Sequence, residues 1–343
     1  MILPFQAPEL TEERAVLFTI LAGDIGATKT RLVCFQCKDG KRNILKEFRY
    51  QSAQFNSILE ILELFLEEMP TIHSVCLAVA GPVVNANAVL TNLHWEVNRK
   101  DISAYFHMEN VFLINDLEAN AYGLAVLDAA DLSLIHETDQ QYNGNAAIIS
   151  PGTGLGEAGL YWDGKHFHPF ASEGGHCDFS PRTPTDTELL FYLGEKFGHV
   201  SWERMVCGPG IVNIYQFLKE EKKMDEPGWL KEKISTGDMP SIISAHIDKS
   251  ALCDETMKLF FRYLAHESAN IVLKLNATGG LFIGGGIAPK LMPCFARYNF
   301  FSSYCNSGRL NSLLEKVSIN VIMNDKAALL GSAYYAMLNF RPG

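Results

Sequence analysis

The apolar and polar positions along the first half of the chain alternate between strand and helix patterns. Residues 21–36 read LAGDIGATKTRLVCFQ, in which a glycine-containing turn separates two apolar runs, so this stretch predicts a β-hairpin. A third strand is expected near residues 43–50, and residues 57–68 repeat apolar side chains at helical spacing. Residues 74–80 are mainly apolar and predict a buried strand that ends at a Gly-Pro pair. This alternation favours an α/β architecture.

The second half repeats the same theme. Residues 111–115 predict a short buried strand, and Asp116 begins a segment rich in helix-forming residues. Residues 146–150 predict another buried strand, followed by the glycine-rich turn PGTGLGEAG and a further strand through residues 160–162. Two units of strand, Gly-Thr turn and strand indicate two related halves, each with a loop that can bind phosphate.

The C-terminal part is more helical. Residues 255–275 predict a long amphipathic helix, and a strand over residues 280–283 leads into three consecutive glycines. Glycines at this place let the backbone approach a flat ligand closely. The expected domains are a smaller α/β domain of residues 15–121 with 325–343, a larger α/β domain of residues 122–324, and an N-terminal extension of residues 1–14.

Composition excludes several classes of function. The chain has 343 residues, of which 48% are hydrophobic, so it can build a large core. A formal net charge of -10, with no run of Lys or Arg, argues against nucleic-acid binding. The N-terminus has no basic region, and its apolar run over residues 15–23 is too short to span a bilayer. We expect a soluble, cytoplasmic protein without a membrane partner.

The eight cysteines are scattered and lie mostly in apolar runs, which favours a reduced chain over a disulfide framework. Cys34 and Cys37 form a CxxC pair on a predicted strand, where residues three apart point to opposite faces. No second CxxC follows, so a zinc or redox site is not expected there.

The first glycine-containing turn nearly forms a Walker A motif. Gly23 opens the pattern, but Thr28 stands where the second glycine is required before Lys29. A Walker A loop leads into a helix, whereas here a strand follows. The tip of a hairpin can still direct backbone amides and a hydroxyl at phosphate oxygens, and Asp24 can sit beside a metal ion. An ordinary hairpin with glycines is the alternative at this point.

Three further groups of polar residues are candidates for chemistry. Asn115 and Asp116 lie at the carboxyl end of a predicted strand, where ligands usually bind in α/β sheets. The start of a helix stabilises a carboxylate at Asp116, which suits a general base. The local sequence alone favours an N-cap aspartate, and the two roles can coexist. Glu173 and His176 are spaced by two glycines that allow a tight turn toward one cavity. Glu203 by itself indicates only a surface position on a helix.

Taken together and in order, these stretches resemble the bacterial-type glucokinases outside the ROK group, within the hexokinase, Hsp70 and actin superfamily of ATPases. The resemblance runs over residues 21–331 and rests on GDIGATKTR, TNLHW, INDLEANAYG, GTGLG, EGGHCDF, ERMVCGPG and IGGGIAPK. It implies a two-lobed, actin-like (ribonuclease H-like) fold with a ligand cleft between the lobes. It also implies ATP-dependent phosphorylation of D-glucose to glucose 6-phosphate at the entry to glycolysis, with Mg²⁺, in a homodimer.

The resemblance assigns roles to individual residues. Asp116 matches the catalytic base that takes the proton of the sugar 6-hydroxyl. Asp24, from its place beside the first phosphate loop, is expected to hold Mg²⁺ through water. The implied sugar-binding residues are Asn92, Asn115, Asp116, Glu173, His176 and Glu203. The implied nucleotide-binding residues are Asp24, Gly26, Ala27, Thr28, Gly152, Thr153, Gly154, Gly284, Gly285 and Gly286.

Two positions depart from the family pattern. Ala27 stands where a second glycine is common, and Lys29 stands where an asparagine is common. A β-carbon at Ala27 can crowd a phosphate, and Lys29 adds a positive charge beside it. The chain also lacks the cysteine-rich zinc motif of the ROK sugar kinases. The competing functions are a kinase for another hexose or amino-sugar, a sugar-sensing regulator without catalysis, and an Hsp70-like ATPase module.

Overall fold

The computed structural model describes residues 3–6, 18–38, 41–67, 69–90, 93–138 and 143–341. They form two compact units. Unit 1 contains residues up to Asp131 together with Leu160–Ala171 and Asn324–Gly343, and unit 2 contains Leu132–Gly159 and Ser172–Met323. The predicted domain boundaries at residues 121 and 325 stay a prediction, and the units are described below one at a time.

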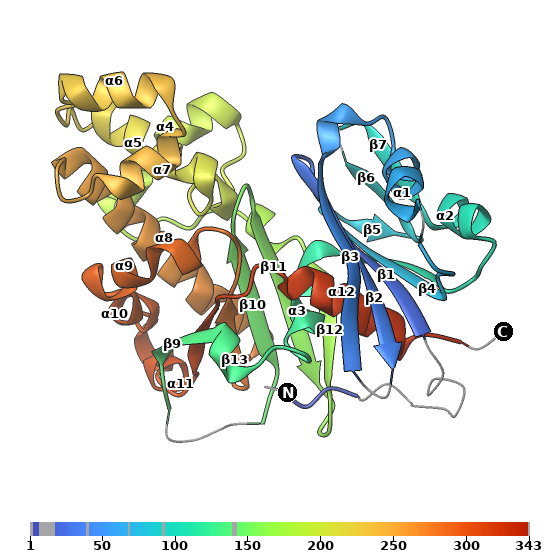
Figure 1. Ribbon diagram of the computed structural model, residues 1–343. Helices are drawn as coiled ribbons and strands as arrows, with labels where there is room; N and C mark the ends of the chain where they lie inside the picture. The colour runs from blue at the N-terminus through green and yellow to red at the C-terminus, as the bar shows by residue number, and fades with distance from the viewer. Residues whose placement is uncertain are drawn as a thin grey trace. The chain divides into compact units, whose positions relative to one another are not determined.

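Unit 1 is built on a five-stranded sheet in the order β3-β2-β1-β4-β8 (Figure 1). The strands are antiparallel between β1, β2 and β3, and parallel between β1, β4 and β8. Their bounds are β1 Phe18–Ile25, β2 Lys29–Lys38, β3 Lys41–Gln51, β4 Ser74–Val79 and β8 Val111–Asn115, and the helices of this unit are α1 Ile58–Leu66, α2 Arg99–Phe106, α3 Asp116–Gly123 and α12 Ala327–Leu338.

Helices cover both faces of this sheet because successive side chains of β1 point to opposite sides. Leu21 and Ile25 share one apolar cluster with α1 and α2, whereas Ile20 and Ala22 share another with α3 and α12. Cys34 belongs to the first cluster and Cys37 to the second, which confirms that the CxxC pair points to opposite faces.

Helices α3 and α12 cross closely, and glycines make that approach possible. A β-carbon on Gly331 would lie 1.8 Å from the carbonyl oxygen of Ala119, and one on Gly123 would lie 2.4 Å from that of Ala327. Helix α12 also contacts β1 and β4. The C-terminal helix therefore fixes α3, which begins at Asp116, against the central sheet.

A small antiparallel sheet that the sequence analysis did not predict lies in unit 1. Its strands are β5 Val83–Val84, β6 Asn87–Leu90 and β7 Trp95–Asn98, in the order β5-β6-β7. Asn85 and Ala86 connect the first two, with φ angles of 52° and 59°. Two central residues with positive φ are typical of a type I′ hairpin turn, in which glycine is more common than alanine at the second position.

The N-terminal residues that the structure describes pack into unit 1. Phe5 is buried, and its ring lies 6.1 to 6.4 Å from the rings of Tyr122, Phe167 and Tyr334. The backbone N–H of Phe167 donates a hydrogen bond of 2.9 Å to the carbonyl oxygen of Pro4. These contacts tie residues 4 and 5 to the segment Leu160–Ala171 and to α3 and α12.

The second large sheet has six strands in the order β12-β11-β10-β13-β14-β9 (Figure 1). The bounds are β9 Leu132–His136, β10 Ala146–Pro151, β11 Leu155–Trp162, β12 Phe167–Ser172, β13 Gly280–Ile283 and β14 Ile319–Ile322. The helices of unit 2 are α4 Pro184–Phe197, α5 Gly208–Glu220, α6 Gly228–Thr236, α7 Met239–Ala245, α8 Ala251–Leu275, α9 Met292–Arg297, α10 Phe300–Tyr304 and α11 Asn311–Leu314.

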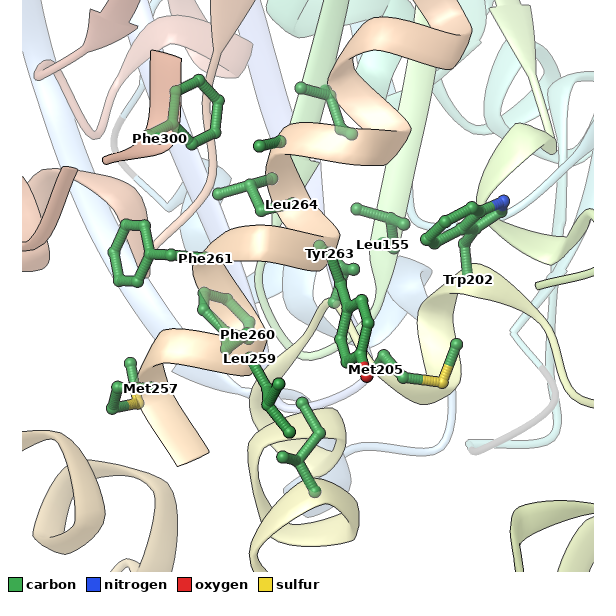
Figure 2. Packing of buried hydrophobic residues seen from close by; sticks show 14 of the residues in the cluster. Leu155, Trp202, Met205, Met257, Leu259, Phe260, Phe261, Tyr263, Leu264 and Phe300 are labelled. Carbon is green, nitrogen blue, oxygen red and sulfur yellow. The ribbon is translucent and has the colours of Figure 1, made fainter. Parts of the chain in front are cut away.

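A single large apolar cluster forms the core of unit 2. Helix α8 lies at its centre and contacts α5, α10 and β10. Figure 2 shows Leu155, Trp202, Met205 and Tyr263 among the residues of this cluster. The loop after β10 and the turn that contains Trp202 are therefore anchored in the same rigid core.

The structure confirms the predicted hairpin of β1 and β2, the strands β3, β4, β8 and β13, and the long helix α8. In the part of the chain that the structure describes, no helix is both long and apolar enough to cross a membrane.

Candidate functional site

The first candidate loop is the tip of the β1–β2 hairpin. The N–H of Gly26 donates a hydrogen bond of 3.0 Å to the carbonyl oxygen of Lys29, which closes the turn. The hydroxyl of Ser52 donates to the carbonyl oxygen of Gly26 at 2.7 Å, and the N–H of Ser52 donates to that of Thr28 at 3.1 Å. The tip is held from behind by Ser52, while the Thr28 side chain remains exposed.

Asp24 lies just before this tip, directly opposite Arg31 in the antiparallel pair. Burial raises the pKa of Asp24 to about 6, and the neighbouring Arg31 opposes that shift. Arg31 is itself engaged by Glu47 and by Asp325, whose carboxyl oxygen lies 3.3 Å from its Nη1. A carboxylate at this place, ionised near neutral pH and beside a phosphate loop, has the chemistry to accept a hydrated cation.

Asn115 and Asp116 lie at the junction of β8 and α3. Asn115, rather than Asp116, is the N-cap: its side-chain oxygen accepts hydrogen bonds from the N–H groups of Leu117 at 2.8 Å and Glu118 at 3.3 Å. Its side-chain N–H donates to the carbonyl oxygen of Gly81 at 3.0 Å. The N-cap explanation of Asp116 is therefore wrong, because a buried amide already caps the helix and Asp116 is its first residue.

The side chains of Asn115 and Asp116 have different surroundings. Asn115 is only 4% exposed, and its side chain is hydrogen-bonded to the backbone of α3 and of the loop after β4. Asp116 is partly exposed, and the N–H of Leu117 lies 3.0 Å from its Oδ1. Asn115 thus holds the start of the helix in place, and the carboxyl group of Asp116 projects from a fixed backbone.

The second candidate loop follows β10. The N–H of Gly152 donates to the carbonyl oxygen of Gly154 at 2.8 Å, and the N–H of Gly208, at the start of α5, donates to the carbonyl oxygen of Gly152 at 2.9 Å. Thr153, at the tip, is exposed. The loop therefore has a fixed backbone, with its hydroxyl-bearing residue directed to solvent.

Glu203 connects this loop to the turn that contains His176. Its Oε2 accepts a hydrogen bond of 2.8 Å from the N–H of Leu155, and its Oε1 lies 3.9 Å from Nδ1 of His176. A β-carbon on Gly154 would lie 2.4 Å from Oε2 of Glu203, so only glycine leaves room for the carboxylate. Three separate stretches of unit 2 meet at Glu203.

The turn over residues 173–177 is a short 3₁₀-helix, Gly174–His176, and its glycines have a different purpose from the predicted one. Neither Gly174 nor Gly175 has a positive φ, so the turn conformation alone does not require them. A β-carbon on Gly174 would lie 2.0 Å from Oε2 of Glu157, and one on Gly175 would lie 2.1 Å from the carbonyl oxygen of Leu155. The glycines let the turn lie directly on β11. Glu173 and His176 themselves are exposed.

Backbone pairing explains why this turn lies beside Glu203. The N–H of Trp202 donates to the carbonyl oxygen of Cys177 at 3.0 Å, and Asp178 forms an isolated bridge with Ser201. The Trp202 ring is buried and packs edge-on against Phe179 with 5.0 Å between ring centres. A partly exposed glutamate is thus held between two anchored neighbours.

The triple glycine follows β13. Gly284 is buried, and a β-carbon on it would lie 2.5 Å from Oγ of Ser150. Gly285 has a φ of 79° and lies against the carbonyl oxygen of Pro151, whereas a β-carbon on Gly286 would meet no heavy atom within 4 Å. The first two glycines pack on the end of β10, and the third faces open space where a ligand can approach.

The remaining candidates are Asn92 and the metal site. Asn92 lies outside the described residues. Among the described residues, no group of three or more His, Cys, Asp and Glu side chains could hold a metal ion by itself. A single carboxylate such as Asp24 fits Mg²⁺ nevertheless, because Mg²⁺ keeps most of its waters and is usually held by one or two carboxylates and the substrate's phosphates.

Sequence reasoning missed the residues that support the site. Glu157, 2% exposed on β11, lies beneath Gly174, and the Oγ of Ser150, beside Gly284, has no hydrogen-bond partner among the described residues. The signal for Glu157 was present, because a charged residue among the apolar positions of a strand is unusual. No comparable signal marks Ser150 in a sequence.

Three comparisons place these features among known proteins. A family model described as Glucokinase matches residues 21–339. A glucokinase of Trichormus variabilis is 37% identical over 337 residues, which cover 92% of this chain and 98% of that protein. A glucokinase structure from an Antarctic psychrotroph is similar with a TM-score of 0.78 and 28% identity, covering 93% of this chain and 98% of the other.

A glucokinase structure from Balamuthia mandrillaris in complex with glucose has a TM-score of 0.79 at 20% identity, covering 95% and 96% of the two chains. At that identity the likeness concerns the fold. Together with the psychrotroph structure, it confirms the predicted two-lobed, actin-like α/β fold.

Proposed function

Because the chain belongs to the glucokinase family, we propose that it transfers the γ-phosphoryl group of ATP to the 6-hydroxyl of D-glucose with Asp116 as the general base. The observation that carries the residue assignment is the β8–α3 junction. Asn115 caps the helix and bonds the loop after β4, so the adjacent carboxyl group stands on a rigid backbone. A general base needs such fixed placement within hydrogen-bond reach of the hydroxyl that it deprotonates.

In the proposed reaction, Asp116 accepts the proton of the 6-hydroxyl as that oxygen attacks the γ-phosphorus. The bond between the γ-phosphorus and the bridging oxygen breaks, and ADP leaves with the electron pair. Glucose 6-phosphate is the other product. The protein supplies mainly positioning and electrostatic stabilisation, as in other phosphoryl transfers.

Glu173, His176 and Glu203 bind the remaining hydroxyl groups of the sugar in this proposal. Carboxylates accept hydrogen bonds from hydroxyls, and an imidazole can donate or accept one. The contacts of Glu203 with the Leu155 amide and with His176 fix the directions in which the Glu203 carboxylate and the His176 ring point. A sugar with one inverted hydroxyl leaves a polar group unpaired, which gives discrimination between epimers. Asn92 is proposed as a further sugar ligand by family resemblance alone.

The two glycine-containing loops are proposed to bind ATP. Gly26, Ala27 and Thr28 of the first loop, and Gly152, Thr153 and Gly154 of the second, line the proposed phosphate site. The N–H groups of Gly26 and Gly152 close their own turns, so the other amides of the loops and the hydroxyls of Thr28 and Thr153 would meet the phosphates. Gly284, Gly285 and Gly286 form the proposed platform for the adenosine. Asp24 would hold the hydrated Mg²⁺, which neutralises the phosphate charge when it is bound.

Other properties are proposed from the family and the sequence. The chain is proposed to belong to the branch outside the ROK group, which the lack of a cysteine-rich zinc motif supports. A homodimeric assembly and a cytoplasmic location are proposed as well. The net charge of -10 supports the absence of a nucleic-acid partner.

The test is release of ADP from Mg-ATP with glucose, mannose, fructose, galactose, glucosamine and N-acetylglucosamine, run beside Asp116→Asn. We expect turnover mainly with glucose, and a loss of about 10²- to 10⁴-fold in kcat for the variant, the range typical of a general base. Calorimetry checks that the variant still binds glucose. Glucose binding without turnover in the wild type would favour a sugar-sensing regulator, and turnover with another sugar would favour the kinase for that sugar.

A further inference from the structure

Two carboxyl groups meet in the interior of unit 2, outside the residues assigned so far. Glu157 on β11 is 2% exposed, and Glu267 on α8 is 0% exposed. The two carboxyl groups are close enough that each shifts the pKa of the other. The Oε1 of Glu267 lies 3.2 Å from Nζ of Lys274, and its Oε2 accepts a hydrogen bond of 2.7 Å from Asn270.

The pair carries one proton at neutral pH. Burial, together with the negative charge of Glu267, raises the pKa of Glu157 well above its ordinary range. Burial also raises the pKa of Glu267, but Asn270 and Lys274 oppose that shift. Glu157 is therefore the more readily protonated partner, and Glu267, beside Asn270 and Lys274, is the more readily ionised one. The Oε1 of Glu157 has no hydrogen-bond partner among the described residues, which adds to the cost of charging it.

This pair lies directly beneath the turn that holds Glu173 and His176. The Oε2 of Glu157 is so close to Gly174 that a β-carbon there would lie 2.0 Å from it and 2.9 Å from Cδ. The Oγ of Ser172 accepts a hydrogen bond of 2.9 Å from the N–H of Gly174, which fixes the start of the turn to the end of β12. Because the carboxyl group of Glu157 lies so close to Gly174, a shift of Glu157 would also shift the turn.

We propose that Glu157 is a positioning residue for sugar binding: with Glu267 it supports Gly174 from below and so sets where Glu173 and His176 stand. The proposal rests on the proposed function, since it concerns the affinity of those two residues for glucose. Glu157 itself touches no substrate and takes no part in the transfer of the phosphoryl group.

The support depends on the shared proton. Loss of that proton at alkaline pH would place two buried negative charges side by side, and their repulsion would displace Glu157 and with it the turn that lies against it. The other charged or titratable groups near the pair are Lys274, Arg182 and Cys177: Arg182 is influenced by Glu267, and Lys274 by Cys177. The positive charge of Lys274 compensates the carboxylate of Glu267, so a second negative charge on Glu157 would have no cation of its own.

The experiment measures kcat, KM for glucose and KM for ATP of the full chain between about pH 6 and 9.5. For the wild type we expect KM for glucose to rise about tenfold from neutral to alkaline pH, the effect of weakening one charged hydrogen bond to the sugar. Glu157→Gln keeps the size and a donor for Glu267 but cannot titrate, so its KM for glucose should stay flat. KM for ATP and kcat should follow the same course in both proteins.

Glu255→Gln is the matched control. Glu255 lies on the same helix, α8, but pairs with Lys258 at the surface at 2.8 Å, so this variant should keep the wild-type profile. Thermal unfolding checks that each variant is folded. If Glu157→Gln fails to fold, Gly174→Ala serves instead: it crowds the pair and should raise KM for glucose at every pH without changing KM for ATP.

A folded Glu157→Gln whose KM for glucose follows the wild-type pH profile would overturn the inference and leave the proposed function intact. So would a Gly174→Ala variant with unchanged KM for glucose. A wild type that releases no ADP with glucose would instead overturn the proposed function, and this inference with it.

Discussion

Gly154→Ala is a sharp test of how Glu203 is held. The added β-carbon would lie 2.4 Å from Oε2 of Glu203 and 3.3 Å from its Cδ. Both atoms belong to the end of a flexible, partly exposed side chain, so the fold can yield by moving the carboxylate. That movement breaks the 2.8 Å hydrogen bond from the Leu155 N–H and changes the 3.9 Å approach to His176.

The magnitude follows from those contacts. A hydrogen bond to a charged group contributes about 1.5–3 kcal/mol, and a displaced sugar ligand loses a comparable amount of binding free energy. Each 1.4 kcal/mol corresponds to about a tenfold change, so kcat/KM for glucose should fall roughly 10- to 100-fold. The free energy of unfolding should fall by at most about 1.5–3 kcal/mol, the contribution of that one hydrogen bond, because the crowded carboxylate can move into solvent.

Steady-state kinetics at varied glucose and ATP, with urea unfolding of the same samples, separate the two effects. Glu203→Gln provides a comparison: its amide can still accept the Leu155 N–H, but it lacks the charge. A Gly154→Ala enzyme with wild-type KM for glucose would refute the reasoning, since the carboxylate cannot keep its place once the β-carbon is present. A variant that fails to fold would also contradict the claim that the strain is relieved at the side chain.

Four further predictions concern stability. Asn115→Ala removes the α3 cap and the bond to the Gly81 carbonyl, so the free energy of urea unfolding should fall by about 1–2 kcal/mol, with Asn115→Asp retaining the cap. Gly331→Ala, with its β-carbon 1.8 Å from a carbonyl oxygen of α3, should cost about 1–3 kcal/mol in the same measurement. Gly194→Ala in α4, which meets no heavy atom within 4 Å, should instead add up to about 1 kcal/mol. Burial, and to a lesser extent the positive charges of Arg182 and Arg262, lowers the pKa of His266 from 6.5 to about 4. The free energy of unfolding should therefore decline by about 3 kcal/mol as the pH falls from 6.5 toward 4, because the unfolded chain binds the proton more readily. His266→Gln should flatten that decline.

The opening hairpin shows why much of the fold could be predicted. Side chains of β1 and β2 alternate strictly between two apolar clusters, and both faces are covered, so the strands appear as nearly continuous apolar runs. A Walker A loop is followed by a helix, whereas the turn at residues 26–28 is followed by a strand. That difference distinguished a hairpin phosphate loop from a Walker A loop in the sequence. Long elements with a clear period, such as α8, were predicted for the same reason.

The small β5-β6-β7 sheet escaped prediction because its local signals are weak. Its strands have two to four residues, too few for a period-two pattern to stand out. Its turn uses Asn85-Ala86 in place of Asn-Gly, so the strongest short-range hairpin signal is missing although both residues have positive φ. Local strain that tertiary contacts must support cannot be read from composition.

The site shows the same limit more sharply at Glu203. The sequence offers only a glutamate in a short helical turn, and it gains a role through contacts with residues 27 and 48 positions earlier. Glu157 is the opposite case: its isolated charge in an apolar strand was visible, but its purpose depends on Glu267, a full 110 positions away, and on the absence of a β-carbon at Gly174. At both places the carboxylate depends on a glycine, Gly154 for Glu203 and Gly174 for Glu157, because the missing β-carbon leaves the space that the carboxylate fills. Gly174 of EGGH is therefore better explained by the acid beneath it than by the turn that it forms, and Gly174→Ala should disturb sugar binding before it disturbs the fold.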